Sequence, residues 1–346
     1  MSQSPPADTS LFAFGIALPT FNGQGELLDA YFPTPKKSVS GELGKIIAAE
    51  LANTSATLSP ETCASLSSHF EQVGDAKLAD TTRQLAESDQ PLLVVCLAGD
   101  AAIDSAATAY LKLHLLSHRL SLPNSMNLEG IFAQLKNVAW TNKGAIDPAE
   151  LQVRQLKGRI EGDEIEVRSI DKFPLMVNYV VPSGVRIADS SRVRLGAYVG
   201  EGTTIMHEGL MNFNTAALGP NMVEGRISQG VVVGAHSDLG GSSSTQGTLS
   251  GGGKHIVSLG EHCLIGANGG CGISLGDRCT IEAGLYITAG TPVMVVDETG
   301  DSGIVKAREL SGHSDLLFIR NAQTGRVECR TNRAAIELNN TLHLHN

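Results

Sequence analysis

The sequence predicts an α/β N-terminal domain followed by a parallel β-solenoid with a short β cap. Aliphatic residues recur at steps of six through the second half of the chain, which predicts the solenoid. Helical periodicity alternates with a short apolar run before residue 150, which predicts the α/β domain. The recurrence stops after Val293. We therefore divide the chain into the α/β domain (1–150), a connecting β segment (151–184), the solenoid (185–293) and the cap (294–346).

Local signals place the elements of the first half. Ser59 and Pro60 suit the N-cap and the first position of a helix. The turn at 97–102 has a single glycine, which is too few for a phosphate-binding loop. Short alternating runs predict β structure in the connecting segment. The expected elements are strands at 10–17 and 91–99 and helices at 40–51, 59–86 with a break near Gly74, 101–118 and 128–135.

The six-residue recurrence decides the fold of the second half. Neither the period of a helix nor that of a strand generates it, whereas a chain that turns a corner every six residues does. The straight segment between two corners is one flat face of the coil. Three such segments make one coil of a solenoid, with one aliphatic side chain per segment pointing to the axis. A glycine-rich β-sandwich would keep five consecutive steps in register only by accident. The recurring residues are Ile187, Val193, Val199, Ile205, Met211, Ile227, Val233, Leu239, Leu259, Ile265, Cys271, Leu275, Ile281, Ile287 and Val293.

The recurrence is interrupted at three places. It is lost in 212–225, and it slips between Cys271 and Leu275. Residues 241–256 are rich in glycine and serine, so we expect a loop ejected from the coil there. Loops held on a rigid scaffold often carry function. Beyond Val293 we expect short strands, with a hairpin at 323–325, that cap the open end of the solenoid.

The composition is that of an ordinary globular protein. Hydrophobic residues make up 42% and charged residues 18% of the chain. The formal net charge of −10 argues against nucleic-acid binding, which needs a basic surface. No apolar run is long enough to span a bilayer and the first residues lack a signal-peptide pattern, so we expect no membrane association and a cytoplasmic protein. The cysteines spaced by eight suit a metal site less well than small apolar fillers of the coil, because zinc ligands usually come in close pairs; they are Cys263, Cys271 and Cys279.

Five stretches together resemble the long form of the tetrahydrodipicolinate N-succinyltransferases. They are HEGLMNFN (207–214), MVEGRISQGVVVG (222–234), TLSGGGKHIVSLG (248–260), IGANGGCGISLGD (265–277) and KARELSG (306–312). The resemblance implies a left-handed parallel β-helix and a homotrimer with active sites between subunits. It also implies transfer of a succinyl group from succinyl-CoA to the amine of ring-opened 2,3,4,5-tetrahydrodipicolinate. The product would be N-succinyl-2-amino-6-oxopimelate, on the route to diaminopimelate and lysine.

Glu224 is the candidate catalytic residue, because it lies where the recurrence breaks. The resemblance implies a covalent role as an acyl anhydride, and a general base in direct transfer is the simpler alternative. A solvated turn glutamate is the non-catalytic reading. Arg226 suits bidentate pairing with a substrate carboxylate, or a surface salt bridge. The resemblance also implies succinyl-CoA contacts at Gly241 and Ser244 in the ejected loop, at Ala267, Glu282, Ala283 and Gly290 along the pantetheine groove, and at Lys306 and Arg320 near the phosphates.

Glu208 is a candidate ligand of a structural Mg²⁺ on the trimer axis, where it would be shared with the same residue of the other copies. The second acidic ligand of the family falls near Ser191, which is not a carboxylate. Asp189 lies two residues early. The metal would be structural rather than catalytic.

Three other functions fit parts of the pattern. Another hexapeptide-repeat acyltransferase, using acetyl-CoA, would need a catalytic histidine. A zinc hydratase would need histidines on adjacent flats of one face, which their spacing does not predict. A non-catalytic scaffold would need neither the glycine-rich loop nor the glutamate at the register break. The available histidines are His207, His236, His255 and His262.

Overall fold

The computed structural model describes residues 10–51, 57–247, 256–296 and 302–331. The chain forms two compact units. The first contains the residues up to 121 and 125–174, and the second contains 122–124 and the residues from 175 onward. Most of the loop expected at 241–256, including His255, and parts of the expected cap lie outside the described residues. Within those ranges, no helix is long and apolar enough to cross a membrane.

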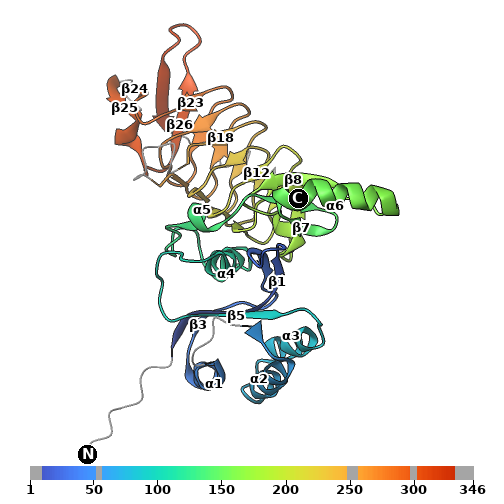
Figure 1. Cartoon of the computed structure of the whole chain (residues 1–346). Coiled ribbons are helices and arrows are strands. Elements are labelled where there is room, and N and C mark those ends of the chain that lie inside the picture. Colours follow the sequence, from blue (N-terminus) through green and yellow to red (C-terminus); the bar gives the residue numbers. More distant parts are fainter. Residues whose placement is uncertain (1–9, 52–56, 248–255, 297–301, 332–346) are drawn as a thin grey trace, which may run out of the picture. The chain divides into compact units, whose positions relative to one another are not determined.

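A five-stranded antiparallel sheet organises the first unit, with helices on both of its faces (Figure 1). Its strands are β1 (Leu11–Phe21), β2 (Leu27–Tyr31), β3 (Lys36–Val39), β4 (Thr57–Leu58) and β5 (Leu92–Leu97). Successive residues of β1 face opposite sides of the sheet. Phe14 and Ile16 join the core formed with α1 (Gly41–Leu51), α2 (Pro60–Gln72) and α3 (Ala76–Ala86). Gly15 faces α4 (Ala106–Ser117), where an added Cβ would lie 3.0 Å from the Leu111 side chain.

Side-chain caps set the helix boundaries. The Ser59 side chain accepts a hydrogen bond from the amide of Thr62, which confirms the predicted start of α2. Gly74 has a φ of 82° between α2 and α3, so the expected break is present. The helix α4 starts later than predicted because its cap is Ser105, whose side chain accepts from the amide of Thr108. The next helix, α5 (Ile131–Gln134), is a single turn.

The turn at 97–102 anchors a buried lysine of α4. The side chain of Lys112 is 1% exposed, and its ammonium group donates a 2.7 Å hydrogen bond to the carboxylate of Asp100. It donates two more, also of 2.7 Å, to the carbonyls of Ala101 and Asn127. All three ammonium protons are therefore used.

The segment predicted as connecting β structure begins instead with a helix, α6 (Pro148–Glu161). The prediction is wrong here because the start signal lies before the segment. Asp147 caps the helix by accepting a hydrogen bond from the amide of Ala149, and Pro148 occupies the first turn. β structure resumes in β8 (Val167–Asp171). This strand pairs with β6 (Val138–Thr141), which also pairs with β7 (Gly144–Ile146), in an antiparallel sheet.

Three parallel sheets of very short strands make up most of the second unit (Figure 1). The chain visits the first, second and third sheets in rotation. The first contains β10 (Ala197–Val199), β13 (Thr215–Ala217), β16 (Val232–Val233) and β19 (Ser258–Leu259). The second contains β9 (Arg186–Ile187), β11 (Thr204–Ile205), β14 (Met222–Val223), β17 (Asp238–Leu239), β20 (Leu264–Ile265) and β22 (Thr280–Ile281). The third contains β12 (Leu210–Met211), β15 (Arg226–Ile227), β18 (Ser244–Thr245), β21 (Gly270–Cys271) and β23 (Tyr286–Ile287).

The recurring residues point into the space between the sheets. The recurrence does not stop after Met211, as the sequence suggested, because Ala217 and Val223 continue it and both are fully buried. The interruption is one shortened corner between Val223 and Ile227. A second short corner follows Cys271. Strands that pair within a sheet are 18 residues apart where all corners are complete and 16 apart where one is short.

The loop predicted at 241–256 begins later than expected. Ser244 and Thr245 form β18, which pairs with β15 and β21. Thr245 takes the inward position and is 1% exposed. Its hydroxyl donates to the carbonyl of Arg226 and accepts from the amide of Ser228. The recurrence therefore includes a threonine, which an aliphatic pattern does not reveal.

Longer strands follow the three sheets. The strand β26 (Leu316–Arg320) pairs in parallel with β22, so the last strand of the second sheet is covered. The expected hairpin joins β26 to β27 (Val327–Thr331). Next to it, β24 (Pro292–Val296) pairs with β27 and with β25 (Ser302–Lys306). The short helix η3 (Ala307–Leu310) follows β25.

Candidate active site

Turns between the second and third sheets lie one above another, along what we name the Glu224 edge. Backbone hydrogen bonds join successive turns. The amide of Ser242 donates to the carbonyl of Glu224 over 3.3 Å, and the amide of Asn268 donates to the carbonyl of Gly241 over 2.9 Å. The edge comprises the turns at 206–209, 224–225, 240–243, 266–269 and 282–285.

The same edge continues toward the cap. The amide of Gly284 donates a 2.8 Å hydrogen bond to the carbonyl of Ala267, which places Ala283 in the adjoining turn. The carboxylate of Glu282 accepts a 2.7 Å hydrogen bond from the amide of Arg320. Residues proposed for one site from distant positions in the sequence therefore share one edge.

Glu224 occupies the shortened corner of this edge. Its amide donates a 2.8 Å hydrogen bond to the carbonyl of Leu239, which fixes the backbone. The residue is half-buried. Its Oε2 lies 3.6 Å from the place that a Cβ on residue 241 would take, so Gly241 leaves that side of the carboxylate uncovered. Among the described residues, none donates a hydrogen bond to the carboxylate, so its oxygens are open to a ligand.

Glu208 lies one turn before Glu224 on the edge and is exposed. Its Oε2 accepts a 3.3 Å hydrogen bond from the hydroxyl of Ser242. Asp189 is engaged elsewhere, because its Oδ1 accepts from both the amide and the hydroxyl of Ser191. Within the described part of one chain, no group of three or more His, Cys, Asp or Glu residues could hold a metal ion.

Arg226 and Ser244 are neighbours on the outward face of the third sheet. They pair in register in β15 and β18, while the residues that follow them, Ile227 and Thr245, face inward and are buried. The prediction that Ser244 lies in an ejected loop is wrong, and so is the same prediction for Gly241. Both residues are held by the hydrogen bonds of the sheets and their turns, so their positions are set by the scaffold.

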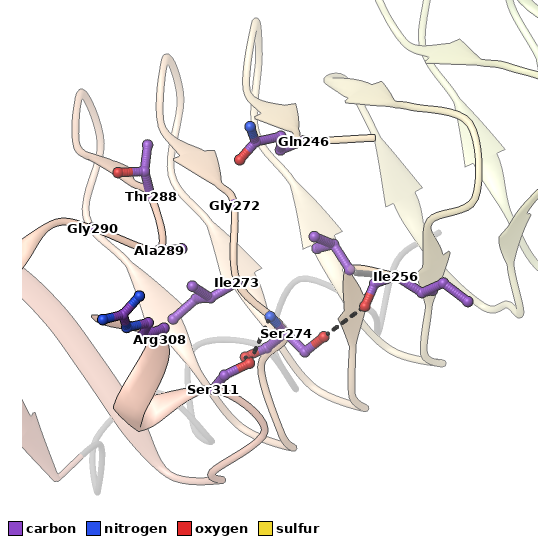
Figure 2. A pocket seen from close by; sticks show the side chains of 11 residues that line it. Gln246, Ile256, Gly272, Ile273, Ser274, Thr288, Ala289, Gly290, Arg308 and Ser311 are labelled. Carbon is purple, nitrogen blue, oxygen red and sulfur yellow. Dashed lines mark hydrogen bonds between the residues drawn. The ribbon is translucent and has the colours of Figure 1, made fainter. Parts of the chain in front are cut away.

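A cleft of about 700 Å³ lies at the opposite edge of the third sheet (Figure 2). It is bordered by the residues that leave β18, β21 and β23 and by η3. The amide of Ser274 donates to the hydroxyl of Ser311 over 3.2 Å, which ties the cleft to the cap. Only Gly290 of the predicted residues lines it. The others include Gln246, Ile273, Thr288 and Arg308.

The two predicted phosphate-binding residues lie in the cap. Lys306 ends β25 and is exposed. The residues after it run beside the cleft, because the amide of Arg308 donates to the carbonyl of Ala289 over 3.2 Å. Arg320 lies at the end of the Glu224 edge instead, and its guanidinium donates a 3.0 Å hydrogen bond to the carbonyl of Gly325.

The evenly spaced cysteines and the histidines occupy different environments. Cys263, Cys271 and Cys279 are fully buried, so they fill the interior as predicted, and burial raises the pKa of Cys271 to about 12. His236 and His262 stack with their ring centroids 4.9 Å apart. The expectation that no histidine pair shares a face is wrong, because the 26-residue offset between β16 and β19 brings positions 236 and 262 into register.

Comparisons with known proteins identify the family. A curated protein of Pseudomonas putida named 2,3,4,5-tetrahydropyridine-2,6-dicarboxylate N-succinyltransferase is 54% identical over 342 residues, which cover 97% of this chain and 99% of that protein. A protein of the same name from Vibrio cholerae is 52% identical over 343 residues, with the same coverage. The chain belongs to this N-succinyltransferase family.

Family models and a solved structure agree with this N-succinyltransferase assignment. The model described as "Tetrahydrodipicolinate N-succinyltransferase middle" matches residues 135–174, and "Hexapeptide repeat of succinyl-transferase" matches residues 256–289. A crystal structure from Campylobacter jejuni, described as a 2,3,4,5-tetrahydropyridine-2-carboxylate N-succinyltransferase, is 31% identical. It superposes with a TM-score of 0.86 and covers 96% of this chain and 95% of that one.

The sequence did not predict several residues that line the cleft of this N-succinyltransferase chain. Arg308 borders the cleft two residues after Lys306, within the stretch KARELSG, and its basic character was the available signal. Gln246 and Thr288 also line the cleft. Nothing in their own residue types marks them, because their position depends on which turns lie next to each other.

Proposed function

We propose that this chain transfers a succinyl group from succinyl-CoA to the amine of ring-opened 2,3,4,5-tetrahydrodipicolinate. The product is N-succinyl-2-amino-6-oxopimelate, an intermediate of diaminopimelate and lysine synthesis. The observation that carries this proposal is the identity of 52–54% to enzymes of that name over nearly the whole of both chains. Full-length similarity of this kind supports a shared reaction, whereas a hexapeptide match alone would support only an acyltransferase fold.

The reaction requires loss of a proton from the amine, stabilisation of an oxyanion and alignment of two substrates. We propose Glu224 as the reactive carboxylate. In direct transfer the amine nitrogen attacks the thioester carbon, the C–S bond breaks, CoA leaves as its thiolate, and the carboxylate takes the amine proton. In the covalent route the carboxylate itself attacks the thioester and CoA leaves as its thiolate. The amine then attacks the succinyl carbonyl of the anhydride, which releases the Glu224 carboxylate, and the amine proton passes to the thiolate. A carboxylate that no described side chain or amide engages suits either role.

The neighbours of Glu224 suit substrate binding. Arg226 presents a guanidinium two residues away, on the outward face of β15, and a guanidinium matches the carboxylate of the succinyl group or of the acceptor. Small residues such as Gly241 and Ala267 leave room for an extended thiol arm along the Glu224 edge. Lys306, two residues before the cleft residue Arg308, suits a phosphate.

The proposed assembly rests on the same family resemblance. We propose that the three parallel sheets form a left-handed β-helix, and that three chains associate with their active sites between subunits. Rotation of the chain through three sheets with pairing offsets of 16 to 26 residues supports a helix of stacked coils. A cation shared by Glu208 of three copies stays a prediction, since the described part of one chain offers no group of three or more His, Cys, Asp or Glu residues that could hold a metal ion.

The decisive experiment measures CoA release from succinyl-CoA in the presence and absence of tetrahydrodipicolinate. Acceptor-dependent release by the wild type, with loss of at least about a hundredfold in Glu224→Ala and Glu224→Gln, supports both the reaction and the role of Glu224. Mass spectrometry of enzyme with donor alone then separates the two routes, because only the covalent route adds a succinyl mass. No release by folded wild type would overturn the proposed function. Full activity of both variants would remove Glu224 from the mechanism.

A further inference from the structure

The outward face of the third sheet carries a row of residues in register. Arg226 pairs with Ser244, Ser244 with Gly270, and Gly270 with Tyr286. The next residue of each strand faces inward and is buried, so these four all face out. Two of them, Arg226 and Ser244, are already candidates for donor binding.

The ring of Tyr286 does not stand up from the sheet but lies over the neighbouring strand. A Cβ added to Gly270 would lie 2.1 Å from two carbons of that ring and 2.7 Å from a third. Gly270 is accordingly buried although it faces outward, while Tyr286 remains 44% exposed. The absence of a side chain at position 270 therefore lets an aromatic ring lie along the sheet with part of its surface open to solvent.

The ring sits between the two ends of the candidate donor site. The chain leaves Tyr286 and Ile287 directly for Thr288 and Gly290, which line the cleft. In the other direction, the strand that carries Ser244 is the next one beyond Gly270, about 5 Å further on. Tyr286 also follows the turn that holds Ala283 on the Glu224 edge, so β23 runs from that edge to Gly290 in the cleft. A ligand that passes from the cleft across β23 to the Glu224 edge meets this ring.

We propose that the Tyr286 ring, held flat by Gly270, is the floor on which the thiol arm of the acyl donor lies. This inference rests on the proposed function, because it assumes a CoA thioester as donor. The arm of CoA is a flexible chain of methylene and amide groups, and such a chain packs on the apolar face of an aromatic ring. A fixed floor reduces the freedom that the arm loses on binding and so improves donor affinity.

The test compares three variants with wild type, using the KM for each substrate and calorimetric binding of CoA alone. Tyr286→Ala removes the floor and should raise the KM for succinyl-CoA and the dissociation constant of CoA roughly tenfold, with the KM for the acceptor unchanged. Tyr286→Phe keeps the ring and should behave as wild type. Gly270→Ala forces the ring off the sheet and should weaken donor binding as Tyr286→Ala does.

The double variant Gly270→Ala/Tyr286→Ala is the most discriminating variant, because both changes act through the same tyrosine ring. Its donor affinity should equal that of Tyr286→Ala rather than fall by the product of the two effects. The matched control is Tyr198→Ala, which removes a tyrosine from the outward face of the first sheet and should leave both KM values unchanged. Unchanged CoA affinity in Tyr286→Ala, or an equal rise in both KM values, would overturn the proposal. A wild type that binds CoA but does not use succinyl-CoA would overturn only the proposed reaction.

Discussion

At the scale of single residues, the first unit holds a histidine in its neutral form. His114 in α4 is fully buried, and its Nε2 accepts a 3.2 Å hydrogen bond from the amide of Phe32. Its Nδ1 lies 2.8 Å from the carbonyl of Tyr110, to which it donates. Both ring nitrogens are thus satisfied only when one proton is present. Burial, which disfavours the charged form, lowers the pKa of His114 to about 3.

This histidine makes stability depend on pH. Between pH 6.5 and 3 the unfolded chain binds a proton at His114 that the folded chain does not, so the free energy of unfolding falls as the pH falls. The expected slope is about 1.4 kcal/mol per pH unit, or about 2 kcal/mol between pH 6.5 and 5. Urea denaturation at several pH values measures it. His114→Asn should give a shallower dependence in this window, and an unchanged slope would contradict the assignment.

At the scale of elements, β18 shows that an inward position of the sheets accepts a polar side chain. Replacing Thr245 by valine restores the aliphatic recurrence and keeps the shape. It also leaves the carbonyl of Arg226 and the amide of Ser228 without the hydrogen bonds that they make with the threonine hydroxyl. We therefore expect Thr245→Val to lose about 1–2 kcal/mol of stability, as measured by chemical denaturation. A variant as stable as wild type would show that these two bonds contribute nothing.

In helix α6, replacing Gly158 by alanine should destabilise the protein, although alanine has the higher helix propensity. An alanine in a helix interior is ordinarily more favourable than glycine by about 1 kcal/mol. Here a Cβ on Gly158 would lie 2.5 Å from the carbonyl oxygen of Asp163. We expect Gly158→Ala to be destabilising by about 1–3 kcal/mol in denaturation experiments. Gln152→Ala, on the exposed surface of the same helix, is the control and should change stability by less than about 0.5 kcal/mol.

At the scale of the whole molecule, two units with separate interiors should unfold separately. Calorimetry should show two transitions, with Gly158→Ala lowering the midpoint of one and Thr245→Val the midpoint of the other. If the second unit trimerises as proposed, its midpoint should also rise with protein concentration, since association stabilises the folded state. A single transition shifted equally by both variants would show that the units unfold together.

The sequence predicted the parts of the molecule that depend on repetition and missed those that depend on contacts between distant turns. The six-residue spacing identified inward-facing aliphatic residues such as Ile205 and Ile265. It did not identify Ala217 and Thr245, whose small or polar side chains fill equivalent inward positions. Glu224 was found because it interrupts the pattern. The cleft could not be found, because it exists only once η3 packs beside the turns that end β21 and β23.

The unequal spacing of paired strands has a consequence for engineering. Strands joined by identical ladders are separated by 16, 18 or 26 residues of chain, so the pairing does not depend on how much chain a corner contains. Loop closure costs rise only slowly with length. A foreign peptide grafted between β18 and β19, the consecutive strands of the three sheets that are farthest apart in sequence, should leave the ladders on either side with their partners.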